Sequence, residues 1–317
     1  MSRDLHCSKV IETAYSKSAA ARSQLAASWR RSAVVHGLDP STELVPDRIA
    51  GSHLKHRRER LERLLYVAAP KLDALYSIVG MSGCGVVMTD ADGVVLEQRF
   101  SDADAPAFKE WGLWQGTNWS EEVEGTNGIG TCLAEKRSVI IHRDEHFHSR
   151  NIGMSCIDVP IYGAEGQLIA ALDVSSARVD QTEAFNQLIA AQATHSGHQI
   201  EASNFSVSFP DCRIIVVDSI VTAANALLAV NEDDIVVGAT RAARKFFDFG
   251  SGALDQSVIV GDILGRTNMT RGFHRAERAA VTRALARVNG NVSQAAKALS
   301  VSRATLYRRM KRLGSHD

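Results

Sequence analysis

The sequence lacks the two features that would place the protein in or across a membrane. No uninterrupted apolar run approaches the roughly eighteen residues that a bilayer-spanning helix needs. The first nine residues have neither the charged start nor the apolar stretch of a secretion signal. We therefore expect a cytoplasmic protein without a membrane partner.

Cysteine is scarce, and its spacing excludes the common structural uses. The 317 residues include five cysteines, an odd number, and no CxxC pair that would hold a metal. The five are Cys7, Cys84, Cys132, Cys156 and Cys212. We interpret them as reduced thiols, which is the usual state of cysteine in a cytoplasmic protein.

A phosphate-binding loop of the GxxxxGK[ST] type is also missing, because no Gly-Lys pair occurs anywhere in the chain. The glycine-rich stretch 124–131 does not replace it, because its spacing differs from GxGxxG and no predicted strand directly precedes it. Without backbone amides and a lysine to neutralise a triphosphate, we expect no ATP hydrolysis. We also expect no catalytic residues, no bound metal and no cofactor.

The chain as a whole has no net charge, but its C-terminal segment is strongly basic. The 36 Lys and Arg residues balance 36 Asp and Glu residues. The segment 275–317 nevertheless contains ten basic and two acidic residues, a net charge of +8. A neutral chain with one strongly basic end predicts a nucleic-acid-binding module joined to other domains.

The basic segment begins with the pattern of two short helices. Residues 276–288 place apolar side chains on one helical stripe, and Asn-Gly-Asn at 289–291 predicts the turn that ends this helix. Ser293 is the predicted N-cap of a second helix that runs to about residue 299. Ala295 and Ala296 are small enough to let the two helix backbones approach closely.

A third helix is predicted from Ser302, as its N-cap, to about residue 312. Leu306, Met310 and Leu313 are four and three residues apart, so they share one buried face. The opposite face carries small side chains at its N-terminal end (Ala304 and Thr305) and basic side chains after them. This arrangement suits a helix that enters the major groove of DNA. A solvated basic tail is the alternative, but the two capped helices and the short turn favour DNA binding.

The residues at 290–292, 295–296, 299 and 302–309 together resemble the Fis-type helix-turn-helix, a module that ends many bacterial enhancer-binding activators. The resemblance implies a homodimer in which the first helix of the module pairs the subunits. Its two recognition helices would enter successive major grooves of palindromic double-stranded DNA. By position it implies Arg303 as the base-reading residue. The DNA-contacting residues that it implies are Ser302, Arg303, Thr305, Arg308, Arg309 and Lys311.

The chain departs from this family at Ser300, where glycine is usual. If Ser300 adopts the left-handed conformation, the cost is on the order of 1 kcal/mol, which a folded domain tolerates.

The region upstream has the pattern of a sheet flanked by helices. Residues 83–100 alternate around an Asp/Gly turn, which predicts a β-hairpin. Further short strands are predicted at 138–141, 158–161 and 168–174, followed by one long helix at 181–201. This order indicates an α+β domain with an antiparallel sheet.

Residues 76–203 resemble a GAF domain, and most closely the GAF domain of acetoin-catabolism regulators. The likeness lies in the loop 124–131, in the histidine-containing segment 142–148 and in a helical lead-in at 28–32 and 36–40. It implies a sensor with a small-molecule pocket between sheet and helices, lined by apolar, aromatic and a few polar groups. The candidate effector-binding residues are Trp111, Trp114, Trp119, Asn127, Cys132, His146, Phe147 and Cys156.

The three histidines of the segment 142–148 admit two interpretations. His142 and His146 would share a face if this segment were helical, and with His148 they would form a metal site. No cysteine lies beside them, so an exposed polar loop is the interpretation that we prefer.

Residues 204–266 predict a strand, a turn, a strand and a helix between positions 227 and 247, and they resemble the core of a PAS-like domain. A spacer or dimer contact is the alternative. We therefore predict an α+β multidomain protein with an all-α C-terminus. Its parts are a helical N-terminal segment (1–75), a GAF-like sensor domain (76–203), a PAS-like or spacer domain (204–266) and a Fis-type helix-turn-helix domain (272–317).

The relatives that this architecture resembles carry an ATPase domain between sensor and helix-turn-helix, and this chain has no room for one. The resulting hypothesis is a one-component transcriptional regulator with a small-molecule effector, with RNA polymerase as a further partner and without enzymatic activity. One alternative is a GAF-type methionine sulfoxide reductase or thiol redox sensor that uses Cys84, Cys132 and Cys156. Another is an architectural DNA-bending protein that senses nothing.

Overall fold

The computed structural model describes residues 2–16, 18–44, 48–178, 181–217, 226–250, 254, 258–264, 277, 280–281, 284–285, 287–288 and 290–312. The chain divides into two compact units, residues 1–256 and 257–317.

Short helices open the first unit. They are α1 (Arg3–Tyr15), α2 (Gln24–Arg30), a π-helical turn η1 (Arg31–Val35), α3 (Gly51–Arg60), α4 (Glu62–Val79) and a 3-10 turn η2 (Gly80–Ser82). Ser2 and Ser23 cap α1 and α2 by accepting backbone N–H bonds in the first turn. Trp29 of α2 is buried against Val10 and Ala14 of α1, so the first two helices pack as a pair.

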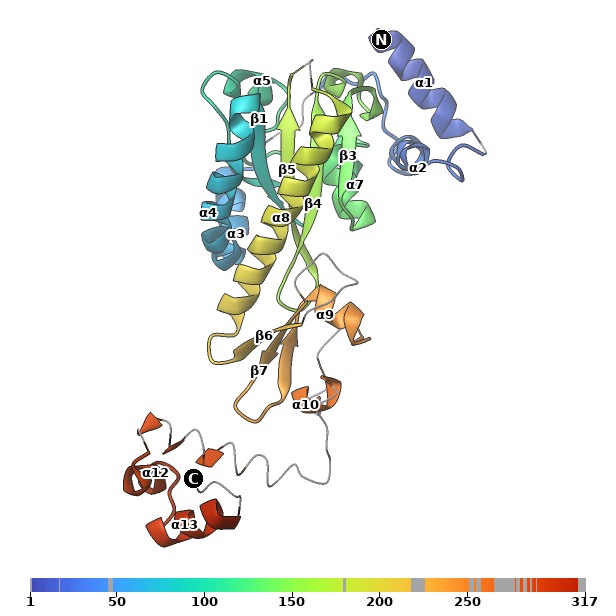
Figure 1. The fold of residues 1–317 in the computed structure, drawn as a ribbon. Helices are drawn as coiled ribbons and strands as arrows, with labels where there is room; N and C mark the ends of the chain where they lie inside the picture. Colours follow the sequence, from blue (N-terminus) through green and yellow to red (C-terminus); the bar gives the residue numbers. More distant parts are fainter. Residues whose placement is uncertain are drawn as a thin grey trace. The chain divides into compact units, whose positions relative to one another are not determined.

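A five-stranded antiparallel sheet forms the centre of the first unit, with the order β2-β1-β5-β4-β3 (Figure 1). The strands are β1 (Cys84–Asp90), β2 (Val95–Arg99), β3 (Val139–His142), β4 (Ser155–Tyr162) and β5 (Leu168–Ser176). The predicted hairpin and the other three predicted strands are all present, and β4 begins three residues earlier than predicted. The α+β prediction is confirmed.

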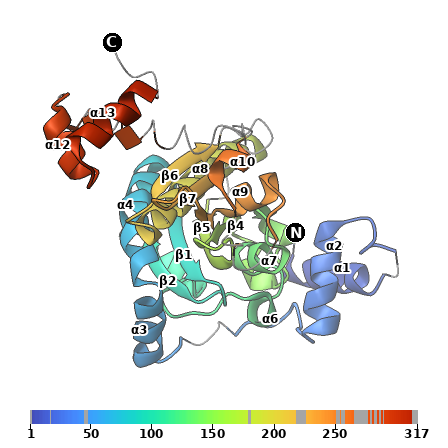
Figure 2. The same cartoon turned by 90° about the horizontal axis from the view of Figure 1, so that it is seen from below.

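Helices cover both faces of this sheet (Figures 1 and 2). The long helix α8 (Glu183–Ser208) packs beside α4 on one face, where Leu72, Leu75 and Ile200 join the side chains of one apolar core. The helices α5 (Ala105–Glu110), α6 (Glu121–Glu124) and α7 (Gly128–Glu135) lie between the strands in sequence, and α7 packs on β4 and β5. Because both faces are covered, β1 and β4 are buried along their whole length.

A second, three-stranded sheet follows α8 in the same unit. Its order is β6-β7-β8, with β6 (Arg213–Val217), β7 (Ala226–Val230) and β8 (Val236–Ala239), and α9 (Arg241–Phe246) packs on β7. The predicted strand, turn, strand and helix between 227 and 247 are present, whereas β6 was not predicted. The helix α8 runs to Ser208, seven residues past its predicted end at 201.

The second unit contains α10 (Val260–Ile263), α12 (Val292–Ala298) and α13 (Arg303–Arg312). Residues 277, 280, 281, 284, 285 and 287 are also helical, in agreement with the helix predicted over 276–288. Its core joins Val281 and Ala284 to Ala295, Leu306 and Met310. The two alanines and the face shared by Leu306 and Met310 are therefore buried as predicted, while Leu313 lies outside the described residues.

Among the described residues, only the stretch Glu62–Ser82 is long and apolar enough, by length and composition, to be considered as a membrane-crossing helix. This stretch comprises α4 and η2, and α4 packs against α8 and the sheet. We interpret it as a core helix, since such helices pass the same compositional test.

Candidate sensor core and nucleic-acid interface

The face of the large sheet that carries α7 has a closely packed apolar core. Trp119, Cys132 and Cys156 share one buried cluster here, and Trp111 packs against it. Trp114 lies at its edge, stacked on Phe100 with ring centroids 5.8 Å apart. The structure thus brings five of the eight predicted effector-binding residues around one core.

Asn127 and His146 join this core through polar contacts. Asn127 caps α7 by accepting from the Gly130 N–H at 2.8 Å, and its side-chain amide donates to the Trp119 carbonyl at 3.1 Å. One ring nitrogen of His146, Nε2, lies 3.3 Å from the Cys156 thiol. Both side chains are fully buried.

Phe147 belongs to a different cluster, beneath the N-terminal helices with Trp29 and Val10. Its ring lies against Gly125, where a Cβ atom would come within 2.6 Å of the ring. Its carbonyl contacts the His6 imidazole at 3.2 Å. Phe147 is therefore placed to hold the N-terminal helices on the domain rather than to line the α7-side core.

A line of polar side chains crosses the otherwise apolar α7-side core. The Ser175 hydroxyl lies 3.2 Å from the Cys156 sulfur and donates to the Asp173 carboxyl at 2.8 Å. Asp158 is paired in register with Asp173 across β4 and β5, and both carboxyl groups are fully buried. The sequence analysis did not predict a role for the two aspartates. Each lies two positions along its strand from Cys156 or Ser175, and side chains two apart in a strand lie on the same face of the sheet.

The carboxyl pair lies under the first turn of α7. A Cβ atom at Gly128 would come within 1.8 Å of an Asp158 carboxyl oxygen, so only glycine allows the helix to approach so closely. Apart from the neighbouring Asp173 carboxyl, which shares a hydrogen bond with Asp158, no group among the residues that the structure describes donates to the Asp158 oxygens. Burial, together with the negative charge of the neighbouring carboxyl, therefore raises the pKa of Asp158, and burial raises that of Asp173 as well.

This pair gives a testable pH dependence. A carboxyl group whose pKa is raised on folding costs stability progressively as pH rises from its unfolded pKa, about 4, towards its folded pKa. We expect Asp158→Asn to be more stable than the unchanged protein at pH 8 and to lose that advantage towards pH 5. Thermal unfolding of both proteins across this range measures the difference, and a difference that is independent of pH would contradict it.

The comparison between the two proteins is needed because other buried groups titrate in the opposite direction. Burial lowers the pKa of His146 and of His148 to about 4, so both destabilise the fold as pH falls below about 6.5. Their contribution is the same in both proteins and cancels in the difference.

The histidine segment is not an exposed loop, so that preferred interpretation was wrong. His146 and His148 lie in the β3–β4 connection and are buried, because the N-terminal helices pack against this connection. The helical alternative is wrong too, since residues 143–145 form only a 3-10 turn. His142 contacts the Ser155 hydroxyl at 2.7 Å, and no cluster of three metal-binding side chains exists among the described residues.

The lead-in clamps the loop before α7; it is helical at 28–32 as predicted, whereas the prediction of helix at 36–40 was wrong. The Arg31 guanidinium forms a two-pronged ion pair with Glu121, at 2.9 and 3.0 Å, and also binds Glu135. The Ser28 hydroxyl binds Glu121 and lies 2.7 Å from the Thr126 hydroxyl. Glu121 is nearly fully buried, so these contacts supply the charge that its carboxylate needs.

A second buried ion pair fixes the same loop from the other side. Arg150 binds both oxygens of Glu124 at 2.5 Å and also donates to the Thr42 carbonyl. Burial raises the pKa of Glu124 to about 7, although Arg150 and Asn151 act in the opposite direction. The loop that resembles the sensor family is therefore held between the lead-in and the β3–β4 connection.

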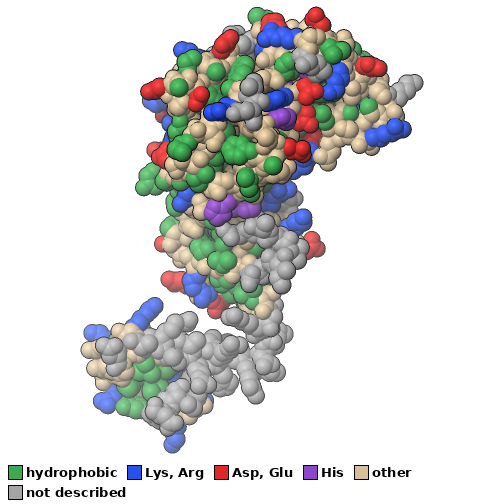
Figure 3. Space-filling model, turned by 45° about the horizontal axis from the view of Figure 1, so that its top comes forward, with side chains coloured by type: hydrophobic (Ala, Val, Ile, Leu, Met, Phe, Trp, Pro, Cys, Tyr) green, Lys and Arg blue, Asp and Glu red, His purple; other side chains and the backbone are tan. Residues whose placement is uncertain are grey.

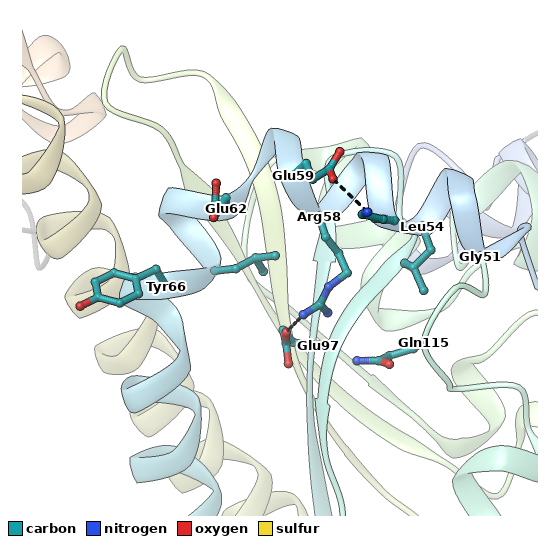
Figure 4. Close-up of a pocket in the computed structure, with 10 residues that line it drawn as sticks. Gly51, Leu54, Arg58, Glu59, Glu62, Tyr66, Glu97 and Gln115 are labelled. Atoms are coloured by element: carbon teal, nitrogen blue, oxygen red, sulfur yellow. Dashed lines mark ion pairs between the residues drawn. The ribbon is translucent and has the colours of Figure 1, made fainter.

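None of the eight predicted effector-binding residues lines the groove of about 660 Å³ between α3, α4 and β2 (Figure 4). Four of its charged side chains form two ion pairs, with Arg58 at 2.6 Å from Glu97 and Lys55 at 3.8 Å from Glu59. This groove therefore lies apart from the α7-side core.

The helix-turn-helix is built with the predicted turn and with one different cap. Asn291, not Ser293, caps α12, because its side chain accepts from the Ser293 and Gln294 N–H groups at 3.1 Å. Ser302 caps α13 as predicted, accepting from the Thr305 N–H at 3.1 Å. Ser300 adopts the left-handed conformation, with φ of 53°.

The outer side of α13 is basic. Arg303, Arg308 and Lys311 are exposed, and Lys and Arg side chains project from this unit in Figure 3. Arg309 pairs with Glu277 at 3.3 Å, and Arg312 pairs with the same carboxylate. Arg309 is thus a predicted DNA contact whose guanidinium already forms an ion pair with Glu277, on the helix before α12.

Comparison with known proteins identifies one family in the region of the large sheet and another in the helix-turn-helix. Residues 67–196 match the GAF domain family, and residues 273–313 match the bacterial regulatory protein, Fis family. The chain joins a GAF domain to a Fis-type helix-turn-helix. Neither match alone extends over half of the chain, and the GAF match begins within α4.

Three similar proteins are named as a regulatory protein or as transcriptional activators. The chain is 28% identical over 238 residues to the acetoin catabolism regulatory protein of Cupriavidus necator, which covers 74% of this chain and 36% of that protein. It is 29% identical over 175 residues to MimR, the propane 2-monooxygenase operon transcriptional activator of Mycolicibacterium smegmatis (55% and 28%). It is 27% identical over 154 residues to the acetoin dehydrogenase operon transcriptional activator AcoR of Bacillus subtilis (49% and 25%). The aligned regions thus span about a quarter to a third of these relatives.

The fold has a counterpart among solved structures. The E. coli DhaR(N)–DhaL complex matches with a TM-score of 0.53 and 16% identity, over 74% of this chain and 79% of that one. At this identity the match supports the shared fold alone.

Proposed function

We propose that the protein is a one-component, DNA-binding transcriptional regulator. In this proposal a dimer senses a small molecule through its GAF domain and binds a palindromic operator through its C-terminal helix-turn-helix. The observation that carries the proposal is the exposed basic face of α13 on a well-packed, capped helix-turn-helix core.

DNA recognition is assigned to the first turns of α13. Arg303 is exposed and follows the Ser302 cap directly, which is where a recognition helix contacts base edges. Thr305, Arg308 and Lys311 follow within the next turns, where DNA phosphates would lie.

Replacing Arg303 tests this assignment. We expect Arg303→Ala to weaken sequence-specific binding to the protein's own upstream DNA by about tenfold or more, because one bidentate base contact contributes about 1–3 kcal/mol. Arg287→Ala is the matched control, since Arg287 is an exposed arginine on the helix that precedes α12, outside the recognition helix. Gel shifts at fixed salt measure both, and undiminished specific binding by Arg303→Ala would remove Arg303 as the base reader.

The proposed dimer has a candidate surface in the first unit. Large apolar side chains are exposed on α4 (Tyr66, 79%), on the turn η2 that follows it (Met81, 92%) and on α8 (Leu188, 68%). An apolar face on two adjacent helices fits association with a second copy of the chain.

Effector sensing is proposed at the α7-side core. Trp119, Cys156 and the Asp158–Asp173 pair place polar groups within an apolar wall, as expected of a small-molecule site. Native mass spectrometry of the purified protein tests for a retained small molecule. We propose further that the protein hydrolyses no ATP, since no Gly-Lys pair exists in the chain. A cytoplasmic location and a contact with RNA polymerase complete the proposal, as expected of a transcriptional regulator.

The alternative function as a methionine sulfoxide reductase or thiol redox sensor is disfavoured by the burial and the raised pKa of the three cysteines that it would use. Burial raises the pKa of Cys84 to about 11 and raises those of Cys132 and Cys156 as well. A reactive cysteine needs the opposite shift and access to solvent. Turnover of methionine sulfoxide by the purified protein would restore this alternative.

A further inference from the structure

A cavity of about 420 Å³ lies where the turn after α4 meets the beginning of α8, away from the α7-side core. It is lined by Met81, Ser82, Arg178, Gln181, Thr182 and Phe185. Most of these side chains carry hydrogen-bond donors, whereas no Asp or Glu is among the lining residues that the structure describes. The chemistry of the cavity is therefore that of a site for a negatively charged group.

Gln181 is the most informative of these residues. Its side chain is only 8% exposed, yet neither its amide nitrogen nor its amide oxygen has a hydrogen-bond partner among the described residues. Buried amide groups in proteins are nearly always hydrogen-bonded. Because Gln181 lines the cavity, a ligand there would accept a hydrogen bond from its amide nitrogen.

The beginning of α8 supplies donors of a second kind. This helix has 26 residues, and Thr182 caps it by accepting from the Phe185 N–H at 3.3 Å. The remaining N–H groups of its first turn have no partner within the helix and attract anions through the helix dipole. Glu183, the acidic residue of this turn, is exposed and does not line the cavity.

Arg178 brings a positive charge to the same cavity. Its side chain lies directly over Gly83, where a Cβ atom would come within 2.6 Å of the arginine Cδ. Gly83 also has a φ of 70°, which favours glycine. The backbone after α4 therefore leaves room for the Arg178 side chain in the cavity that Gln181 and Thr182 also line.

We propose that the junction of α4 and α8 binds a small oxyanion, a carboxylate or phosphate group, through Gln181, Arg178 and the first turn of α8. The ligand would connect the end of α4 to the beginning of α8. These are the helices of the proposed dimer surface, so the site would couple an anionic metabolite to dimer geometry. That coupling rests on the proposed function, whereas the binding site itself does not.

Titration of the full chain with inorganic phosphate and with acetate, each against chloride at equal ionic strength, tests the site and separates its two ligand classes. We expect at least one of the two anions to raise the unfolding temperature saturably. We expect Gln181→Glu to weaken this binding by about tenfold, because it places a negative charge beside the anion. Gln187→Glu is the matched control, since it adds the same charge to an exposed position of α8, and it should change binding by less than about twofold.

Gln181→Met keeps the test decisive if Gln181→Glu fails to fold, because it removes the amide without adding charge and should also weaken binding. The proposal is overturned if neither anion acts beyond chloride, or if the Gln181 variants bind as the unchanged protein does. Because these measurements use no DNA, they can fail while the proposed regulator function stands, and the reverse also holds.

Discussion

Gly128→Ala is expected to lower the unfolding temperature of the first unit by about 10 °C, from a loss of about 3 kcal/mol. A Cβ atom at this position would meet an Asp158 carboxyl oxygen at 1.8 Å and the Cys156 Cβ at 2.6 Å. Both neighbours belong to the inner strand β4, which is held between β5 and β3 and buried along its whole length, so it cannot move aside. The helix α7 must therefore shift away from the sheet and open the core.

Gly51→Ala is the control for this change. Nothing lies within 4 Å of a Cβ atom at Gly51, in the first turn of α3, so alanine there should be neutral or slightly stabilising. Thermal unfolding followed by circular dichroism measures both variants. If Gly128→Ala unfolds at the temperature of the unchanged protein, the close packing of α7 on the Asp158–Asp173 pair is wrong.

Leu306→Ala is expected to abolish most DNA binding while leaving the first unit folded. Leu306 is fully buried at the centre of the small helix-turn-helix core, with Ala295 and Met310. Truncating a buried leucine costs about 2–5 kcal/mol, and a unit of this size has little more stability than that. Since DNA binds only the folded unit, we expect affinity to fall by about tenfold or more.

Gln294→Ala is the matched control, because its side chain is exposed on α12. Fluorescence anisotropy with a duplex from the protein's own upstream region measures affinity, and thermal unfolding reports on the first unit. Equal losses of stability in both units would show that they do not fold independently, contrary to the division of the chain.

The helix-turn-helix was predictable because its determinants are local. Cap residues, a three-residue turn and side chains spaced three and four apart all act within forty residues or so, and they predict the burial of Leu306 and Met310. The one error, Ser293 in place of Asn291 as a cap, is a choice between two neighbouring good caps. Glu277 was not foreseen as a partner of Arg309, because that contact joins two helices 32 positions apart.

The α7-side core and its surroundings were less predictable, because the residues that contact one another there are distant in sequence. Buried strands lack the alternation that identifies half-exposed ones, so Asp158 and Asp173 gave no sign that they pair across β4 and β5. His148 is covered partly by the lead-in around Asp39, more than a hundred residues earlier, which local pattern could not show. Family resemblance located this region, while contacts such as Arg31–Glu121 explain why the lead-in accompanies the domain.

Footprinting of the upstream DNA with the full-length chain tests the central claim most directly. A dimer with two recognition helices should protect two half-sites of a palindrome, centred one helical turn of about 10–10.5 base pairs apart or a multiple of it. Arg303→Ala should lose this protection at the same protein concentration. Uniform coverage without sequence preference, or no protection at all, would contradict the account of this protein as a sequence-specific regulator.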